Sequence, residues 1–419
     1  MIRLISFYRN YRKDKHYTLH VIYLLVLLWA ISYMSFEYFI PVFLESTLGN
    51  LALVGMFLSL PSIVGILLDV YFGHLQTKRS IKLLFFAALT LFFCAGVSIL
   101  FGGQYIPFIL LGMMFYGVGF DFFDITAYTG IFDNSTKRES STNLAVRDVF
   151  ECVGLMIGAV LAGFVLAESG NGLLYIFIGV VLVAIILSQV LLRKKRVKFR
   201  VKDEPHSFFE HLRLNLVILR DDLKVIFRTR MALMCLILIF IITFFDGMFF
   251  GFEPLFAQTL KNPYLDERIV GGLLLATYVA PIIFFEYLFG RFSDRFGKKS
   301  FIILGMVVAS LSLFLLSSTE SIFLVFVSIF FVSFGVFSIS WSAITGLYED
   351  EMKLTVGKRR DGESVGVMEL FMNSGYVLGP LVGGFLTHFF MFRKTFLIVG
   401  FLFVLVVAVA VLVFSYRKK

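Results

Sequence analysis

Long apolar runs separated by short polar breaks follow one another along almost the whole chain. A helix needs roughly 20 apolar residues to cross about 30 Å of hydrocarbon. This criterion predicts six membrane spans in the first half of the chain, at residues 19–44, 50–71, 81–102, 105–129, 143–167 and 173–192. It predicts six more in the second half, at residues 231–257, 270–292, 300–317, 321–346, 362–389 and 395–415. The pattern therefore predicts an all-α membrane protein with twelve transmembrane helices.

Short segments of similar sequence recur in the same order in the two halves. Four matches make the repeat: 39–43 with 252–256, 66–73 with 283–290, 127–133 with 343–349, and Gly154 and Gly158 with Gly375 and Gly379. Ordered matches of this kind indicate that one six-helix unit was duplicated. The predicted organisation is two pseudo-symmetric six-helix bundles, at residues 1–192 and 231–419, joined by a linker at residues 193–230.

The linker is basic, and its apolar residues follow helical spacing between Phe209 and Ile226, with charged residues on the other faces. This pattern predicts an amphipathic helix that lies on the cytoplasmic surface of the membrane. A structural tether between the two bundles is the favoured role, and regulation is the alternative.

The basic residues indicate which way the chain crosses the membrane, because basic loops are retained in the cytoplasm. With both termini in the cytoplasm, only Lys261, Arg268, Arg393 and Lys394 lie outside, and the rest of the 38 Lys and Arg residues fall at the tails and alternate loops. The net charge of +9 is therefore interpreted as a topology signal. It does not indicate nucleic-acid binding, since no basic stretch belongs to a soluble domain of any size.

Composition excludes a water-soluble fold. The chain is 59% hydrophobic and 16% charged, with a mean hydropathy of +0.89, whereas about a quarter of an average soluble chain is charged. The first span is long and carries Glu37, so it is expected to stay attached rather than to be cleaved as a signal peptide. The predicted location is the plasma membrane, which in a prokaryote is the inner membrane.

A short motif follows the eighth predicted span, where residues 290–299 read Gly-Arg-Phe-Ser-Asp-Arg-Phe-Gly-Lys-Lys. It resembles the signature loop of the major facilitator superfamily. The resemblance implies a secondary transporter that works by alternating access. It also implies a gating role for Gly290, Asp294, Arg295, Gly297 and Lys298. The counterpart in the first half, residues 73–79, lacks the acidic residue.

A glycine-rich segment in the eleventh predicted span resembles a glycine-proline motif that many antiporters of this superfamily carry in the fifth helix. Its residues are Gly375, Gly379, Pro380, Gly383 and Gly384. Small residues at this spacing also let two helices pack closely, and helix packing is the alternative interpretation.

Acidic residues inside predicted spans are candidate sites, because an ionised group in a bilayer is costly unless it is paired or hydrated. The resemblance implies that helices one, four, seven and ten line a central cavity. It places on them the acids Glu37, Asp121, Asp124 and Asp246. Glu253 lies closer to the outside. A second set is predicted to form a charge network and consists of Arg147, Asp148, Glu151 and Glu369.

Two interpretations of the cavity acids remain open. A carboxyl group in an apolar cavity readily holds a proton, which suits a group that loads and releases a proton in each cycle. The acids could instead bind a cationic substrate or pair with Arg147. Aromatic residues on the same helices, among them Trp29, Tyr33 and Trp341, would suit a lipophilic or cationic organic solute.

No other class of function fits the sequence as well. No phosphate-binding loop is present, and the six His residues lie in loops or at span ends, so neither a metal site nor a nucleophile constellation emerges. We expect that the protein is not an enzyme and needs no cofactor. The sequence predicts a monomeric secondary transporter, coupled to protons, that exports a lipophilic or cationic small molecule across the lipid bilayer. The alternatives are proton-coupled or facilitated uptake of a metabolite, and a transport-inactive membrane sensor or scaffold.

Overall fold

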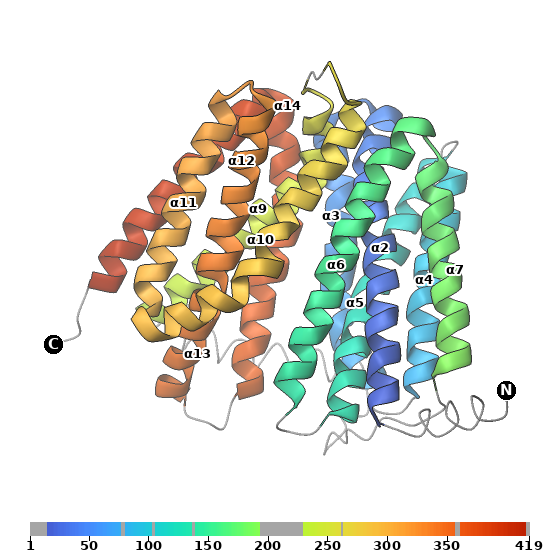
Figure 1. Ribbon diagram of the computed structural model, residues 1–419, viewed down its shortest axis with the longest axis horizontal. Coiled ribbons are helices and arrows are strands. Elements are labelled where there is room, and N and C mark those ends of the chain that lie inside the picture. Colours follow the sequence, from blue (N-terminus) through green and yellow to red (C-terminus); the bar gives the residue numbers. More distant parts are fainter. Residues whose placement is uncertain are drawn as a thin grey trace. The chain divides into compact units, whose positions relative to one another are not determined.

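The computed structural model describes residues 15–76, 80–102, 105–135, 139–192, 229–260, 263–356 and 361–415. Nearly all of these residues are helical (Figure 1). Most of the predicted linker, residues 193–228, lies outside the described residues, so its amphipathic helix stays a prediction.

The predicted spans lie in the described helices, apart from the end residues Asn50, Tyr105, Leu192 and Ser321, which fall one position beyond a helix end. The first half contains α2 (Lys15–Leu48), α3 (Leu51–Gln76), α4 (Ile81–Gly102), α5 (Ile106–Asn134), α6 (Ser140–Glu168) and α7 (Gly172–Leu191). The second half contains α9 (Arg230–Ala257), α10 (Glu267–Phe296), α11 (Lys298–Ser318), α12 (Ile322–Ser333), η1 (Phe334–Trp341), α13 (Ser342–Val356) and α14 (Asp361–Ser415). The predicted tenth span is one continuous helix made of α12, η1 and α13, in which η1 is a π-helix.

Among the described residues, ten helical segments are long and apolar enough to cross a membrane, and Leu51–Ile66 is a shorter apolar helix. The last two predicted spans share α14, whose backbone is not helical at Met391 (φ 64°, ψ 164°). The all-α membrane fold is therefore confirmed, while the full count of twelve crossings stays a prediction.

The chain forms two compact units. Unit 1 contains residues 1–36 and 63–206, and unit 2 contains residues 37–62 and 207–419. Each unit consists mainly of one predicted half, but the second part of α2 and the first part of α3 belong to unit 2. The predicted domain boundaries, at the two ends of the linker, stay a prediction.

Glycines bring helix backbones together in unit 1. Gly154 and Gly158 are one turn apart on α6 and face α2. A Cβ atom at Gly154 would lie 2.7 Å from the backbone oxygen of Leu27, and one at Gly158 would lie 2.6 Å from that of Ile31. A side chain larger than hydrogen at either position would clash with the α2 backbone at these distances. The two glycines therefore determine how closely α6 and α2 approach.

The predicted glycine-proline segment has the same function in unit 2, where α14 packs along α9. A Cβ atom at Gly375 would lie 2.8 Å from the backbone oxygen of Phe240, and one at Gly379 would lie 2.9 Å from the backbone nitrogen of Met248. Further along α14, Gly384 meets α3 at Gly55. The structure therefore contains the helix packing contacts that the alternative interpretation of this segment predicts.

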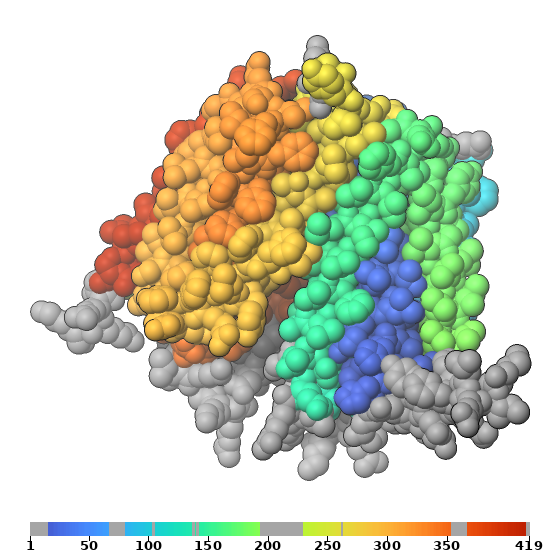
Figure 2. All heavy atoms as spheres, in the orientation of Figure 1, coloured from blue at the N-terminus to red at the C-terminus, as the bar shows by residue number. Residues whose placement is uncertain are grey.

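Large apolar side chains remain exposed on the outward faces of the helices. On α11 and α12 they include Leu304, Leu311, Leu315, Phe323 and Phe331, and these two helices contribute to the face of the molecule seen in Figure 2. A soluble protein rarely exposes so many, whereas a lipid environment favours them.

Candidate functional site

Asp246 lies in the interior of unit 2 and accepts hydrogen bonds from two tyrosines on two other helices. The Tyr278 hydroxyl of α10 donates to Asp246 Oδ1 at 2.8 Å, and the Tyr376 hydroxyl of α14 donates to Oδ2 at 2.9 Å. The Asp246 residue is 5% exposed. Its helix, α9, is apolar on nearly every face and buried from Ile241 to Phe249, so this carboxyl group stands in an apolar setting.

Aromatic rings surround the Asp246 group. Phe249 lies one turn further along α9 and stacks on Tyr278 with 4.4 Å between ring centroids. On the other side, Phe337 meets the Tyr278 ring edge-on at 6.0 Å, and Trp341 lies 6.1 Å from Phe337. The Asp246 carboxylate, its two tyrosine partners and these rings form one set, which we call the Asp246 cluster: Asp246, Phe249, Tyr278, Phe337, Trp341 and Tyr376.

The π-helix η1 positions Phe337 and Trp341. Its wider turn is fixed by bonds from its own side chains to neighbouring helices. The Ser338 hydroxyl donates to the backbone oxygen of Pro281 at 2.9 Å, and the Ser340 hydroxyl donates to that of Ile302 at 3.3 Å. Runs of π-helix are rare and occur frequently at functional sites.

The chemistry of the Asp246 cluster suits a proton or an organic cation. Among the described residues, no cationic side chain forms an ion pair with Asp246, and the partners of its carboxylate are the two hydroxyl groups. An ionised carboxylate accepts from both tyrosines, and a protonated one can donate to a hydroxyl that has turned to accept. A cation could instead bind between the carboxylate and the aromatic faces.

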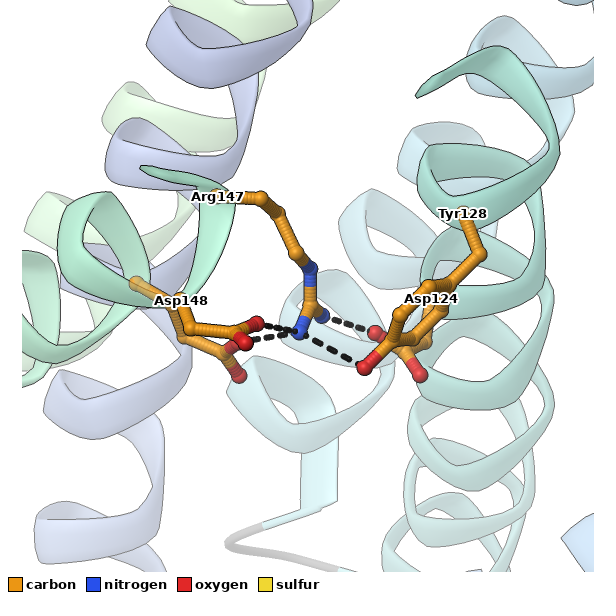
Figure 3. A network of polar contacts seen from close by, with 5 residues as sticks. Asp124, Tyr128, Arg147 and Asp148 are labelled. Atoms are coloured by element: carbon orange, nitrogen blue, oxygen red, sulfur yellow. Dashed lines mark hydrogen bonds and ion pairs between the residues drawn. The ribbon is translucent and has the colours of Figure 1, made fainter. Parts of the chain in front are cut away.

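A second polar group is centred on Arg147 in unit 1 (Figure 3). This residue is 4% exposed. Its guanidinium group pairs with Asp124 of α5, with Asp148 at 2.9 Å and with Glu151 at 2.7 Å. The group also donates to the Tyr128 hydroxyl at 3.1 Å and lies 4.4 Å from the centre of that ring.

One guanidinium group therefore holds three carboxyl groups, and the cluster is net negative when all of them are ionised. Arg147 pairs with Asp148 and Glu151, two members of the predicted charge network, and with Asp124, a pairing that was left open as the alternative to a cavity role for that acid. The fourth predicted member, Glu369, lies on α14 in unit 2, where it is exposed. Its place in a charge network stays a prediction.

The predicted aromatic residues of the first half form a stacked core in unit 1. Trp29 stacks on Phe123 with 4.7 Å between centroids and on Tyr33 with 5.3 Å. Tyr33 in turn stacks on Tyr116 at 5.9 Å. The Trp29 indole nitrogen is buried without a hydrogen-bond partner, which is unusual for tryptophan in a core.

The remaining candidate acids lie on α2 and α5. Glu37 is half-buried on α2 and belongs to unit 2, whereas Asp121 is half-buried on α5 and its carboxyl group lies against Gly65 of α3 in unit 1. Their roles in binding a substrate or a proton stay predictions. Among the residues that the structure describes, no group of three or more His, Cys, Asp and Glu side chains could hold a metal ion.

The predicted gating loop joins α10 to α11. Gly297 has φ +105°, a backbone conformation that favours glycine, and it ends α10 and begins α11 in one step. Lys298 pairs with Asp350 of α13 at 2.7 Å and with Asp294 at 3.6 Å. Gly290 lies against Ser342, and the exposed Arg295 covers the Phe296 ring at 5.4 Å. The gating role of the loop stays a prediction.

Sequence reasoning missed three tyrosines, Tyr128, Tyr278 and Tyr376. Each hydrogen bonds to a charged residue on another helix. Tyrosine is common near membrane surfaces, so its presence in a span carries little signal. Tyr376 lies inside the glycine-rich segment, and that position was the one available clue.

One family model matches the chain along most of its length. The family model described as Major Facilitator Superfamily matches residues 22–266 and 263–419. Together the two matches cover both predicted halves.

Relatives with described functions match a shorter part of the chain. The Tetracycline resistance protein, class H, of Pasteurella multocida is 24% identical over 154 residues, which are 36% of this chain and 37% of that protein. The Multidrug resistance protein 2 of Bacillus subtilis is 29% identical over 140 residues, 32% of each. The chain thus matches about a third of the length of these relatives.

Solved structures match nearly the whole chain at low identity. The nucleoside transporter NupG has a TM-score of 0.72 at 13% identity, over 96% of this chain and 100% of that one. A bacterial homolog of the human lysosomal transporter Spinster, in an inward-facing conformation, has a TM-score of 0.70 at 14% identity, over 95% of this chain and 96% of that one. At these identities the likeness shows the fold.

Proposed function

Because the chain belongs to the Major Facilitator Superfamily, we propose that it is a proton-coupled secondary transporter that exports a lipophilic or cationic organic compound. The observation that carries this proposal is the Asp246 cluster. It presents one carboxyl group, two hydroxyl donors and three further aromatic rings in the apolar interior of unit 2.

The cluster supports a cationic or lipophilic substrate on chemical grounds. An organic cation gains from a carboxylate that no basic side chain neutralises, and aromatic faces attract both its charge and its apolar groups. Export is supported by the relatives, which are named for resistance to tetracycline and to multiple drugs. The Asp246 carboxylate can bind a proton or an organic cation, but not both at once. This competition between the two is the simplest basis for exchanging protons for substrate.

The proposal is tested in proteoliposomes with a pH gradient. With tetraphenylphosphonium as the probe, an acidic lumen should drive its accumulation in the vesicles, since protons leave as the cation enters. Accumulation driven instead by an alkaline lumen would support uptake together with protons, which is the alternative. No gradient-dependent flux of this probe or of a neutral lipophilic probe would contradict the proposal.

Asp246→Asn provides the matched control, because the amide keeps the size of the side chain but carries neither a charge nor an exchangeable carboxyl proton. We expect gradient-driven flux to fall to the level of empty vesicles. Glu168→Asn changes an acidic residue at the exposed end of α6 and should leave the flux unchanged.

A further inference from the structure

Among the residues that the structure describes, Glu253 of α9 is buried without a polar partner. The residue is 1% exposed, and neither carboxyl oxygen has a hydrogen-bond partner. It lies seven residues after Asp246, which places it about 10 Å further along the helix. The two acids differ sharply, because Asp246 is held by two hydroxyl donors whereas Glu253 has none.

A contact between α2 and α10 lies beside Glu253. The Tyr38 hydroxyl of α2 donates to the backbone oxygen of Arg268 at 2.6 Å, and it also lies against Gly271 of α10. A Cβ atom at Gly271 would lie 2.9 Å from the Cβ of Ala257, which is one turn beyond Glu253 on the same face of α9. We call this contact, which is formed by Tyr38, Ala257, Arg268 and Gly271, the outer contact. The name follows the topology predicted from the basic residues, which places this end of the spans outside.

Among the described residues, no titratable group at this end of unit 2 forms a hydrogen bond or an ion pair with Glu253. The single hydroxyl proton of Tyr38 is already donated to Arg268. The titratable and charged groups of the described elements that pack here are Tyr38 and Glu45 on α2, Asp266, Glu267 and Arg268 at the start of α10, and His388, Arg393 and Lys394 on α14. None of them forms a hydrogen bond or an ion pair with Glu253.

The fold itself does not require an acid at this position. In the repeated segments 39–43 and 252–256, Glu253 corresponds to Ile40, which is also buried. An ionised carboxylate without water or a donor costs many kcal/mol, so the group is accommodated here in its neutral form.

We propose that Glu253 is a proton-binding site of the gate on the outer side, neutral while the outer contact is closed and ionised when the contact opens. On opening, water reaches the carboxyl group and its proton passes to water, and closing takes one proton back from the outer solution. No other bond forms or breaks. The inference rests on the proposed function only in that the transporter alternates between closed and open states of this gate.

The direction of the pH effect follows from proton balance. The closed state binds one proton more than the open state, so acid favours closing and alkali favours opening. For a single proton the ratio of the two states changes by up to tenfold per pH unit. Low external pH should therefore hold the gate closed.

Spin labels on α2 and before α10 can follow the outer contact in the full chain. Ser46 and Tyr264 are exposed, Tyr264 by 91%, and both can be changed to cysteine after Cys94, Cys152 and Cys235 are replaced. We expect the long-distance population to rise with pH in the parent protein. In Glu253→Gln, which mimics the neutral acid, the short distance should dominate at every pH. An equal pH response in both proteins would overturn the proposal.

Two additions separate a specific effect from a folding defect. Glu253→Ile restores the residue of the first half and should give the same pH-independent distances as Glu253→Gln. Glu45→Gln removes another acid on the same side and should keep the parental response. In difference infrared spectra, the carbonyl band of a protonated carboxylic acid should be present in the parent at neutral pH and absent in Glu253→Gln. Its presence in both would overturn the assignment.

These readouts need no substrate. If neither tetraphenylphosphonium nor a neutral lipophilic probe is transported but the distances respond to pH through Glu253, the proposed function fails and the gate proposal stands. If transport occurs and the distances do not respond, the gate proposal fails alone.

Discussion

Arg147 on α6 forms an ion pair with Asp124 on α5 inside unit 1. The same guanidinium group also pairs with Asp148 and Glu151. The cation thus neutralises acids that would otherwise repel one another across two packed helices. A buried charge held in this way is costly to lose, because its partners then remain without compensation.

Arg147→Ala should lower the stability of the protein by about 1–3 kcal/mol, less than the loss of a partner from a fully buried ion pair, since it leaves the half-buried carboxyl groups of Asp124 and Glu151 unpaired. Thermal unfolding in detergent, followed by tryptophan fluorescence, measures the change. Arg147→Lys keeps the charge but not the planar fork of donors, so its stability should lie between that of the parent protein and that of Arg147→Ala. Asp148→Asn is the control: its side chain is 57% exposed, and it should change stability by less than about 1 kcal/mol. Equal effects of Arg147→Ala and Asp148→Asn would contradict the role of the cluster.

Tyr278→Phe and Tyr376→Phe should each slow gradient-driven transport by about tenfold or more. A hydrogen bond to a charged group contributes about 1.5–3 kcal/mol, and about 1.4 kcal/mol corresponds to a factor of ten. Flux into proteoliposomes at saturating substrate measures the effect. Tyr175→Phe, which changes an exposed tyrosine on α7, should transport normally. Parental rates in both variants of the Asp246 partners would remove the hydroxyl groups from the mechanism.

Asp246→Asn can separate the two roles open to this acid. If Asp246 carries only the proton, the variant should still exchange labelled for unlabelled substrate across vesicles without a gradient, while gradient-driven flux is lost. If Asp246 also binds the substrate cation, exchange should be lost as well. We expect loss of both, because Tyr278, which donates to the carboxyl group, also packs against the rings of Phe249 and Phe337. Unchanged gradient-driven flux would contradict either role.

Gly379→Ala should destabilise the protein by about 1–3 kcal/mol, because the added methyl group meets the α9 backbone at Met248. Thermal unfolding measures the loss. Gly179→Ala on α7 is the matched control, since nothing lies within 4 Å of a Cβ atom at that position. It should be neutral or slightly stabilising. A neutral Gly379→Ala would mean that α9 and α14 can move apart without cost.

Topology is tested by cysteine labelling in intact cells with a reagent that does not cross membranes. In a background without native cysteines, Tyr264→Cys should react, because this exposed residue is predicted to face outside. Lys298→Cys should react only after the membrane is opened. The reverse pattern would invert the orientation of the whole chain and place the outer contact at the cytoplasmic side.

The sequence by itself determined the class of the protein and the positions of its spans. Hydrophobic length is sufficient for this purpose, because a bilayer imposes one minimum length on every crossing helix. The predicted spans accordingly lie in the described helices to within one residue beyond a helix end, and the last two share α14. The motif at residues 290–299 indicated the family for a similar reason, since its residues are contiguous and need no tertiary contact to be recognised.

Tertiary structure alone decided which polar groups meet. Asp246 was predicted as a site from its position in a span, but its partners Tyr278 and Tyr376 come from helices 32 and 130 residues away in sequence. The isolation of Glu253 could not be read from the sequence either, because burial without a partner is a property of everything packed around a residue. A helix pattern predicts which residues share a face, whereas the packing of several helices decides whether a charge on that face finds a donor, a counter-charge or neither.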